Sequence, residues 1–239
     1  PSSSNNGSTK ILAATSLQVG QPAPEQPDHG EVVVQVSGSG GKSNDMKRDP
    51  HWDLLQAWLQ RMLCGGDIPA RLVLLTGKAC LRLVISVVVL EDGGNLMDAS
   101  LLACMAAWKD TRLPVIGQDL IESQGKLWWK DGAAVSSAVV AAADEKKTMD
   151  EDALPRDYRI SLTMGIYQSS SSKDAIHFLV DPSAQEEPFL DGTVTITVAL
   201  TSGKLQVEYA GQAALSATDL ALAAKLAKAR AAELSNILL

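Results

Sequence analysis

One stretch of the chain, Leu83–Trp108 (LVISVVVLEDGGNLMDASLLACMAAW), decides its fold class. The first eight residues are apolar except for one serine, and the run is too short for a typical helix. It therefore predicts a buried strand covered on both faces. Asp92–Asn95 (DGGN) then permits positive φ, which allows a tight reversal. From Asp98 to Trp108 small and apolar residues recur on every side, which indicates a helix between layers. A buried strand that feeds a buried helix predicts a layered α/β domain.

The glycine turn between this strand and this helix is a candidate phosphate site. Backbone N–H groups at the start of a helix, together with the helix dipole, favour an anion there. The next residues, Asn95 and Leu96, supply neither a hydroxyl nor a cation. Asp98 begins the helix, where it favours the dipole and could cap it, and Asp181 ends an apolar strand; we interpret both as structural.

A second feature to be explained is the adjacent carboxylate pair Glu186–Glu187. Alternation along a strand would send the two side chains to opposite faces. The following Pro188 favours a loop instead. The pair therefore does not predict a two-carboxylate catalytic site.

Six further segments resemble one known family, in the family's order and over nearly the whole chain. They are Gly7–Ala14, Gly20–Gly30, Thr76–Cys80, Leu179–Glu187, Thr193–Val198 with the turn Ser202–Lys204, and Ser216–Leu239. The family is that of the phosphorolytic ribonuclease RNase PH. Its catalytic members continue the glycine turn as Gly-Gly-Thr/Ser-Arg, whose hydroxyl and guanidinium help to hold phosphate. Here Gly93–Leu96 is instead similar to the Gly-Asn-x-x-Asp-Ala pattern of the non-catalytic subunits of the eukaryotic exosome ring.

The resemblance implies an α/β structure of the α+β two-layer kind. This is the RNase PH-like fold, which ribosomal protein uS5 domain 2 shares, with mixed sheets packed on helices. It implies a single domain over residues 1–239 that lacks the family's N-terminal segment, and a flexible insertion or loop at 131–157.

Two types of ring subunit resemble the chain. Gly77–Ala79 and the run Asp181–Glu187 favour the ribosomal-RNA-processing protein 43 type. Gly93–Leu96 and Thr111–Pro114 would also suit the protein 42 type. We prefer the first.

The resemblance also bears on catalysis. Phosphorolysis needs a clamp that positions phosphate, and a carboxylate that binds metal or protonates the leaving oxygen. Catalytic relatives carry Gly-Asp-x-Asp before the late strand. Alignment of that strand places Thr193 and Thr195 where the acidic residues fall, and the register of Asp191 turns its side chain elsewhere. The sequence thus predicts no catalytic residue, no metal site and no cofactor.

The function that the resemblance implies is that of a non-catalytic subunit of the RNA exosome core ring. The ring threads RNA for 3'-to-5' processing and decay, including rRNA maturation and mRNA turnover. The implied partners are other RNase PH-like subunits in a hexamer, OB-fold/KH cap subunits, a processive exoribonuclease and RNA, in the nucleus, nucleolus and cytoplasm. Two alternatives remain: an active phosphorolytic 3'-to-5' exoribonuclease, and a small-ligand-binding α/β domain that uses Gly93–Gly94.

The charge balance limits how the chain could contact RNA. It has 28 acidic and 21 basic residues, a net charge of -7, and 46% hydrophobic residues, enough for a sizeable core. RNA binding through the whole surface is therefore disfavoured. A local basic strip could face the pore, and the candidates are Lys42, Lys47 and Arg48 in a Gly/Ser-rich loop that begins at Ser37. The alternative is a solvated loop.

The cysteines and histidines do not form a metal motif. The cysteines are widely spaced, and we interpret them as buried apolar residues of a reducing compartment: Cys64, Cys80 and Cys104. The histidines stand singly in a polar loop, at a helix entrance and at a strand edge: His29, His51 and His177. No apolar run reaches the ~20 residues of a membrane span, because Lys78 and Arg82 interrupt the longest one. We expect a soluble protein without a secretory signal.

Periodicity predicts further elements. Strands are expected at Lys10–Val19, Glu31–Val36, Ile121–Lys130, Arg159–Tyr167 and Ala175–Val180, and helices at Trp52–Leu63 and Ser216–Leu239.

Overall fold

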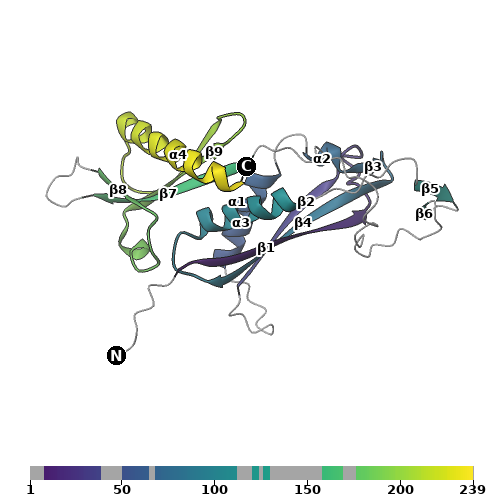
Figure 1. The fold of residues 1–239 in the computed structure, drawn as a ribbon, viewed down its shortest axis with the longest axis horizontal. Helices are drawn as coiled ribbons and strands as arrows, with labels where there is room; N and C mark the ends of the chain where they lie inside the picture. Colours follow the sequence, from purple (N-terminus) through teal and green to yellow (C-terminus); the bar gives the residue numbers. More distant parts are fainter. Residues whose placement is uncertain are drawn as a thin grey trace, which may run out of the picture.

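The computed structural model describes residues 8–38, 50–64, 68–111, 120–123, 126–129, 158–168 and 176–238. The described residues form two four-stranded sheets and a separate hairpin. Figure 1 shows the two sheets beside one another, with helices packed on and between them. The predicted RNA-binding residues Lys42, Lys47 and Arg48, and the predicted loop at 131–157, lie outside the described residues and stay predictions.

The first sheet is built around the long strand predicted at residues 83–90. Strand β4 (Ala79–Glu91) pairs with β1 (Lys10–Gly20) in antiparallel register and with β2 (Glu31–Gly38) in parallel register. A short strand, β3 (Val73–Leu75), also pairs with β4, after the four-residue helix α2 (Ile68–Arg71). The predicted strands at Lys10–Val19 and Glu31–Val36 are confirmed.

Helix α1 (Pro50–Leu63) closes the outer edge of this sheet. The side chain of Gln60 accepts a hydrogen bond from the N–H of Val34 at 2.7 Å and donates one to the carbonyl of Val32. Gln56 accepts from the N–H of Val36 at 3.2 Å. A strand edge normally exposes such groups for pairing with other chains. Here glutamine side chains of one helix satisfy them.

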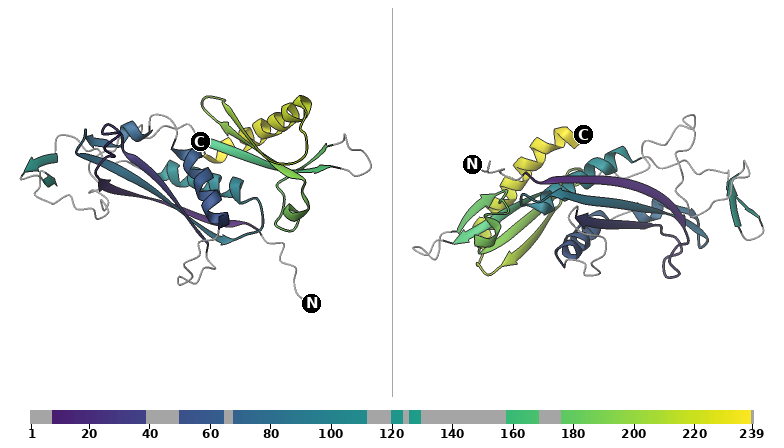
Figure 2. Two further views of the ribbon diagram at one scale, coloured as in Figure 1. Left: turned by 180° about the vertical axis from the view of Figure 1, so that it is seen from behind. Right: turned by 90° about the horizontal axis from the view of Figure 1, so that it is seen from below.

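The prediction that β4 is covered on both faces is wrong for the later part of one face, although Val84 on that face is buried. Leu83, Ile85 and Val87 are fully buried, whereas Ser86 and Val88 are half-buried and Leu90 is 47% exposed. Helix α1 packs on β2, helix α3 packs on β1 and β4, and the two helices contact each other, so together they bury one face of the sheet; Figure 2 shows both helices beside its strands. Apolar residues on the open face made a half-covered strand look like a fully buried one.

The second sheet contains the late strands of the chain. Its order is β10 (Leu205–Gly211), β9 (Gly192–Ala199), β7 (Arg159–Gln168), β8 (Ile176–Val180), and every pairing is antiparallel. Helix α4 (Ala217–Leu238) covers the apolar face of β7 and β9 with the buried small residues Ala223, Ala227 and Ala231. The predicted strands at Arg159–Tyr167, Ala175–Val180 and Thr193–Val198 and the predicted C-terminal helix are confirmed.

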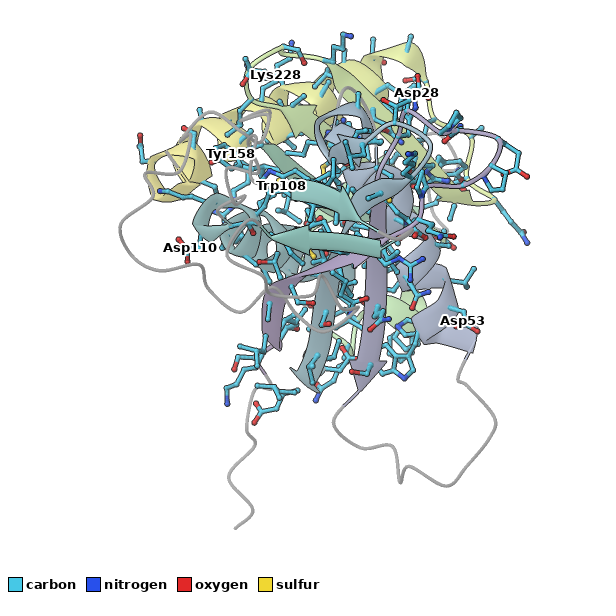
Figure 3. All side chains as sticks on the ribbon, turned by 90° about the vertical axis from the view of Figure 1, so that its right-hand side faces the viewer. Asp28, Asp53, Trp108, Asp110, Tyr158 and Lys228 are labelled. Atoms are coloured by element: carbon cyan, nitrogen blue, oxygen red, sulfur yellow. The ribbon has the colours of Figure 1, made fainter. Side chains whose placement is uncertain are left out.

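Helix α3 (Leu96–Asp110) lies between the two sheets and contacts both β1 and β7. Its fully buried residues include Leu101 and Cys104, and Trp108 is 5% exposed. Figure 3 shows Trp108 within the molecule, whereas the labelled carboxylates Asp53 and Asp110 lie at its margin. The prediction of a helix between layers is confirmed.

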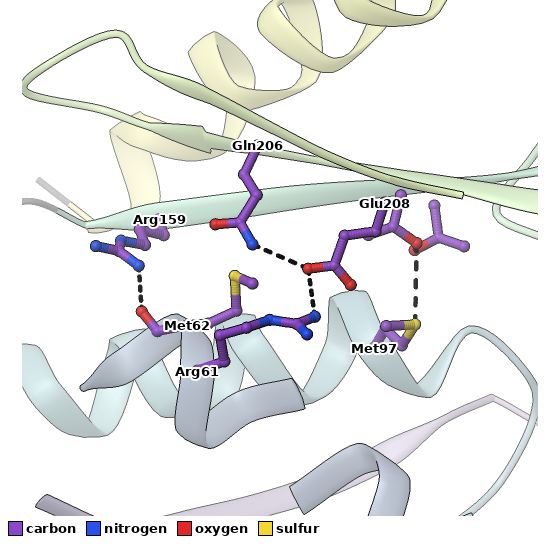
Figure 4. A network of polar contacts seen from close by, with 8 residues as sticks. Arg61, Met62, Met97, Arg159, Gln206 and Glu208 are labelled. Carbon is purple, nitrogen blue, oxygen red and sulfur yellow. Dashed lines mark hydrogen bonds and ion pairs between the residues drawn. The ribbon is translucent and has the colours of Figure 1, made fainter. Parts of the chain in front are cut away.

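Polar contacts also join α1 to the second sheet (Figure 4). Arg61 donates to Glu208 of β10 at 2.5 Å, and Glu208 also accepts from Gln206 at 2.9 Å. Arg159 at the start of β7 donates to the carbonyl of Met62. The two halves are therefore connected through α1 as well as through α3.

One predicted strand has a different form. The segment predicted as a single strand, Ile121–Lys130, contains a hairpin of β5 (Leu120–Ser123) and β6 (Lys126–Trp129). The sequence-based assignment also omitted β3 and β10. Among the described residues, no helix is long and apolar enough to cross a membrane.

Candidate anion site at the start of helix α3

The glycine turn between β4 and α3 has the backbone geometry of an anion-binding turn. Gly94 has a φ of +106°, and Asn95, the N-cap of α3, is left-handed with φ 50° and ψ 48°. A glycine turn directly before a helix is a common setting for a phosphate, because backbone N–H groups there have no partner within the helix.

Those N–H groups are already bonded to oxygens of the chain itself. The N–H of Gly93 donates to the Thr9 hydroxyl at 3.1 Å, and that of Gly94 donates to the Asp92 carboxylate at 3.0 Å. The N–H of Asn95 donates to Oε1 of Glu187 at 2.8 Å. Glu187 belongs to the 3-10 turn η1 (Glu187–Phe189) after strand β8, 92 residues away in sequence. Its carboxylate takes the place that an anionic ligand would occupy.

The loop from Asp181 to Glu187 covers the turn with its backbone. The N–H of Ala184 donates to the carbonyl of Gly93 at 2.8 Å. A Cβ added to Gly94 would lie 2.5 Å from the carbonyl carbon of Ser183 and 2.6 Å from the carbonyl oxygen of Pro182. The glycine is therefore required by a close approach of this loop, and the loop occupies the space beside the turn.

The loop from Asp181 to Glu187 is also held by hydrogen bonds between its own residues. Glu186 accepts hydrogen bonds from the N–H and the hydroxyl of Ser183, at 2.9 and 2.7 Å. These bonds favour the charged form, so they hold the pKa of the exposed Glu186 carboxyl below its usual value. The carboxylate of Glu186 thus bonds within its own loop, whereas that of Glu187 bonds the Asn95 N–H, as expected for a pair on a loop.

The side chain of Asn95 links two carboxylates. Its amide nitrogen donates to Asp98 at 2.9 Å and to Asp181 at 2.7 Å, while its amide oxygen has no hydrogen-bond partner among the described residues. Asn95 is 8% exposed, and Asp181 is held at a left-handed φ of 58°. An arginine here would carry charge to a ligand, whereas this neutral amide joins the start of α3 to the end of β8.

Asp98 extends these contacts into the second sheet. Its carboxylate accepts from the N–H and the hydroxyl of Thr163, at 2.6 and 2.9 Å, and the Thr163 hydroxyl lies 3.0 Å from that of Thr195. The structural roles predicted for Asp98 and Asp181 agree with these contacts. The N-cap of α3 is Asn95, however, so Asp98 does not cap the helix.

The positions where catalytic relatives were expected to carry carboxylates hold none. Thr195 is buried, 4% exposed, and Thr193 is half-buried in the same strand. Asp191 points away from them, as predicted, and accepts from the N–H of Gln168 at 2.7 Å. Within the described ranges no group of three His, Cys, Asp or Glu residues could hold a metal ion. At this turn the N–H groups of Gly93, Gly94 and Asn95 are bonded to the chain itself, and the two threonine positions carry no carboxylate.

Other residues considered from the sequence lie away from this turn. All three cysteines are free thiols, and Cys80 and Cys104 are buried as predicted, whereas Cys64 is only half-buried. Burial raises the pKa of the Cys64 thiol to about 11 and that of Cys104 to about 12. A hollow of about 430 Å³ lies along β2, lined in part by Gln56 and Ser86, not at the glycine turn.

Sequence reasoning identified the glycine turn and Thr195 but missed the residues that close the site. Thr9, Thr163 and Glu187 approach the turn from three distant segments. No local pattern reports such contacts. The only sequence signal was the carboxylate pair in a proline-containing loop.

Comparison with known proteins shows which proteins the chain is similar to. Residues 3–114 match the 3' exoribonuclease family, domain 1 (RNase PH). The chain is 28% identical to the exosome complex component Rrp42 of Thermococcus kodakarensis, over 87% of this chain and 68% of that protein. It is 27% identical to Rrp42 of Thermococcus gammatolerans, over 98% of this chain and 78% of that protein.

Solved structures with a similar fold also come from exosomes. A chain in the structure of the Archaeoglobus fulgidus exosome with RNA bound to the active site superimposes with a TM-score of 0.68 at 22% identity. The match covers 97% of this chain and 80% of that one. The predicted RNase PH-like fold is therefore confirmed, and the similarity to exosome core subunits extends over nearly the whole chain.

Proposed function

We propose that this chain is a non-catalytic structural subunit of an RNA exosome core ring and helps to form the channel that threads RNA. The observation that carries the proposal is the filled anion site, in which the Glu187 carboxylate bonds the Asn95 N–H. The relatives named as exosome components and the shared fold support the ring role.

The absence of catalysis follows from charge and space. A phosphate at the turn would have to displace Glu187 and the loop backbone that lies against Gly94. It would then lie beside Asp98 and Asp181, whose negative charges repel it. Thr195 can neither carry a negative charge nor accept a proton at neutral pH. Both requirements of phosphorolysis are unmet in the described site.

The proposed assembly contains other RNase PH-like subunits in a hexameric ring, an OB-fold/KH cap and a separate processive exoribonuclease. Lys42, Lys47 and Arg48 are proposed to contact RNA in the channel. We place the activity in rRNA maturation and mRNA turnover, in the nucleus, nucleolus and cytoplasm. Of the two ring types, the protein 43 type is our proposal from the sequence, although the two relatives described above are named Rrp42.

The test is an assay of the purified chain with 5'-labelled RNA and inorganic phosphate, alone and together with the RNase PH-like subunits of its organism. We expect a stoichiometric complex and no nucleoside diphosphate from the chain alone. A catalytic RNase PH-like subunit in the same buffer is the control. Phosphate-dependent release of nucleoside diphosphates by the isolated chain would refute the proposal.

The RNA contacts need a separate test in the assembled ring. Replacing Lys42, Lys47 and Arg48 together by alanine should weaken RNA crosslinking and reduce its salt dependence, since each lost phosphate contact lowers the salt slope by about one. The matched control replaces three exposed cations of α4, Lys225, Lys228 and Arg230. Equal losses in both triple variants would contradict a specific role for the loop.

A further inference from the structure

Among the described residues, the turn after strand β8 carries the large hydrophobic side chain with the highest exposed fraction. Phe189 in η1 is 78% exposed, and Tyr167 of β7 and Leu179 of β8 are 51% and 37% exposed. Leu179 pairs with Gly165, two residues from Tyr167, so both side chains stand on the same face of the second sheet. Figure 1 shows η1, in green, projecting from the margin of that sheet.

The turn is fixed, so the exposure of Phe189 is built into the fold. A Cβ on Gly165 would lie 2.6 Å from both methyl groups of Leu190, which shows that Leu190 packs directly on this glycine. The N–H of Phe189 donates to the backbone carbonyl of Glu186 at 2.9 Å, and the N–H of Asp191 donates to the backbone carbonyl of Ile166 at 2.9 Å. A rigid aromatic side chain held in water is typical of an anchor for a partner.

The charge around this turn selects the partner. Between Lys173 and Lys204 the sequence contains no lysine or arginine and five acidic residues. Glu187 is turned inward to Asn95, but Glu186 is exposed beside Phe189, and Asp181 and Asp191 flank the loop. Carboxylates repel RNA phosphates, so this face does not suit RNA. It suits a protein with basic residues around an apolar pocket.

Strand β8 adds a backbone edge to the same surface. In the described part of the chain, β8 ends the second sheet and pairs only with β7. An open edge that carries apolar side chains is a ready site for a neighbouring protein. The open edge of β8, the exposed Phe189 and the carboxylates around the loop therefore belong to the same end of the second sheet.

We propose that Tyr167, Leu179 and Phe189, flanked by Asp181, Glu186 and Asp191, form a docking surface for a neighbouring RNase PH-like subunit, which inserts an apolar pocket over Phe189 and places basic residues opposite the carboxylates. This inference rests on the proposed ring role. It deepens that role by naming the surface and the chemistry of the neighbour.

The experiment is co-expression of the full chain with the RNase PH-like subunits of its organism, followed by native mass measurement and titration of the complex. The test variant is Phe189→Ser. The matched control is Leu54→Ser, which removes an equally exposed apolar side chain, 72% exposed, from α1. Neither side chain is buried, so both variants should keep the unfolding midpoint of the wild type.

We expect Phe189→Ser to weaken assembly by about 10- to 100-fold, as for an aromatic anchor, and Leu54→Ser to leave it unchanged. Glu186→Gln, which keeps an acceptor for Ser183, should reduce the salt dependence of assembly, whereas the exposed Glu233→Gln on α4 should not.

The outcomes separate the two proposals. If the wild type assembles, and Phe189→Ser weakens the assembly no more than Leu54→Ser does, this inference is wrong. The proposed ring role is then unaffected. Failure of the wild type to join any RNase PH-like subunit overturns the ring role. If the wild-type chain assembles only with itself, and Phe189→Ser weakens that assembly, the partner is a second copy of this chain and the stated partner is wrong.

Discussion

Substitution of Gly94 by alanine tests whether the loop after β8 really fills the anion site. An alanine at a φ of +106° is strained by about 1–3 kcal/mol. Its Cβ would also lie 2.5 and 2.6 Å from backbone atoms of Ser183 and Pro182, and such overpacking costs about 1–3 kcal/mol. We therefore expect Gly94→Ala to lower the free energy of unfolding by about 4 kcal/mol.

Gly203 provides the matched control. Its φ is +66°, yet a Cβ there would meet nothing within 4 Å, so Gly203→Ala should cost only about 1–2 kcal/mol of backbone strain. The entropy that alanine removes from the unfolded chain is common to both variants and cancels in the comparison. Urea unfolding with a shared m value measures the difference. If Gly94→Ala were within about 1 kcal/mol of Gly203→Ala, the loop would not lie against the turn.

Three further predictions concern the core and the connections of the two sheets. Leu101→Ala in α3, where the side chain is fully buried, should lower the free energy of unfolding by about 3 kcal/mol or more, whereas Leu222→Ala on exposed α4 should cost under about 0.5 kcal/mol; thermal or urea unfolding compares them. Burial raises the pKa of the Cys104 thiol from 9.0 to about 12, so the unfolded state loses this proton first. Cys104 should then lower stability between pH 9 and 12 by up to about 1.4 kcal/mol per pH unit, and Cys104→Ala should remove this contribution while the one from Cys64 stays. A double-mutant cycle for Arg61 and Glu208 should give a coupling of no more than about 1 kcal/mol, because Arg61 is 60% exposed; a larger value that resists salt would contradict this.

The parts of the fold that the sequence predicts well are those with a strong local pattern. Strand β4 and helix α3 are recognisable because an apolar run, a glycine turn and a second apolar run follow one another at residues 83–108. Which side chains of β4 are buried by other elements could not be predicted in the same way. Leu90 is as apolar as Leu83, and only the arrangement of α1 and α3 exposes the first and buries the second.

The errors have similar causes. Strand β10 (LQVEYAG) alternates apolar and polar residues, but it is an edge strand and largely exposed, so burial did not reinforce the pattern. At the candidate site, the missing hydroxyl and cation after Gly94 were visible in the sequence. The occupant was not, because Glu187 reaches Asn95 only once β8, η1 and α3 have come together in the fold.

The contacts that fill the anion site also join helix α3 to the second sheet, and this connects the proposed loss of catalysis with stability. Asn95 is the N-cap of α3 and Asp98 lies in its first turn, and this helix packs on both sheets; Asp181, Glu187 and Thr163 belong to the second sheet and its loop. An enzyme must keep such a site open for its ligand and accept unsatisfied donors and repelling charges there. In this chain the backbone N–H donors of the turn are bonded to acceptors of the same chain, so the site is now a polar contact between α3 and the second sheet. A substitution that reopened it would therefore have to weaken the junction of the two halves before phosphate could enter.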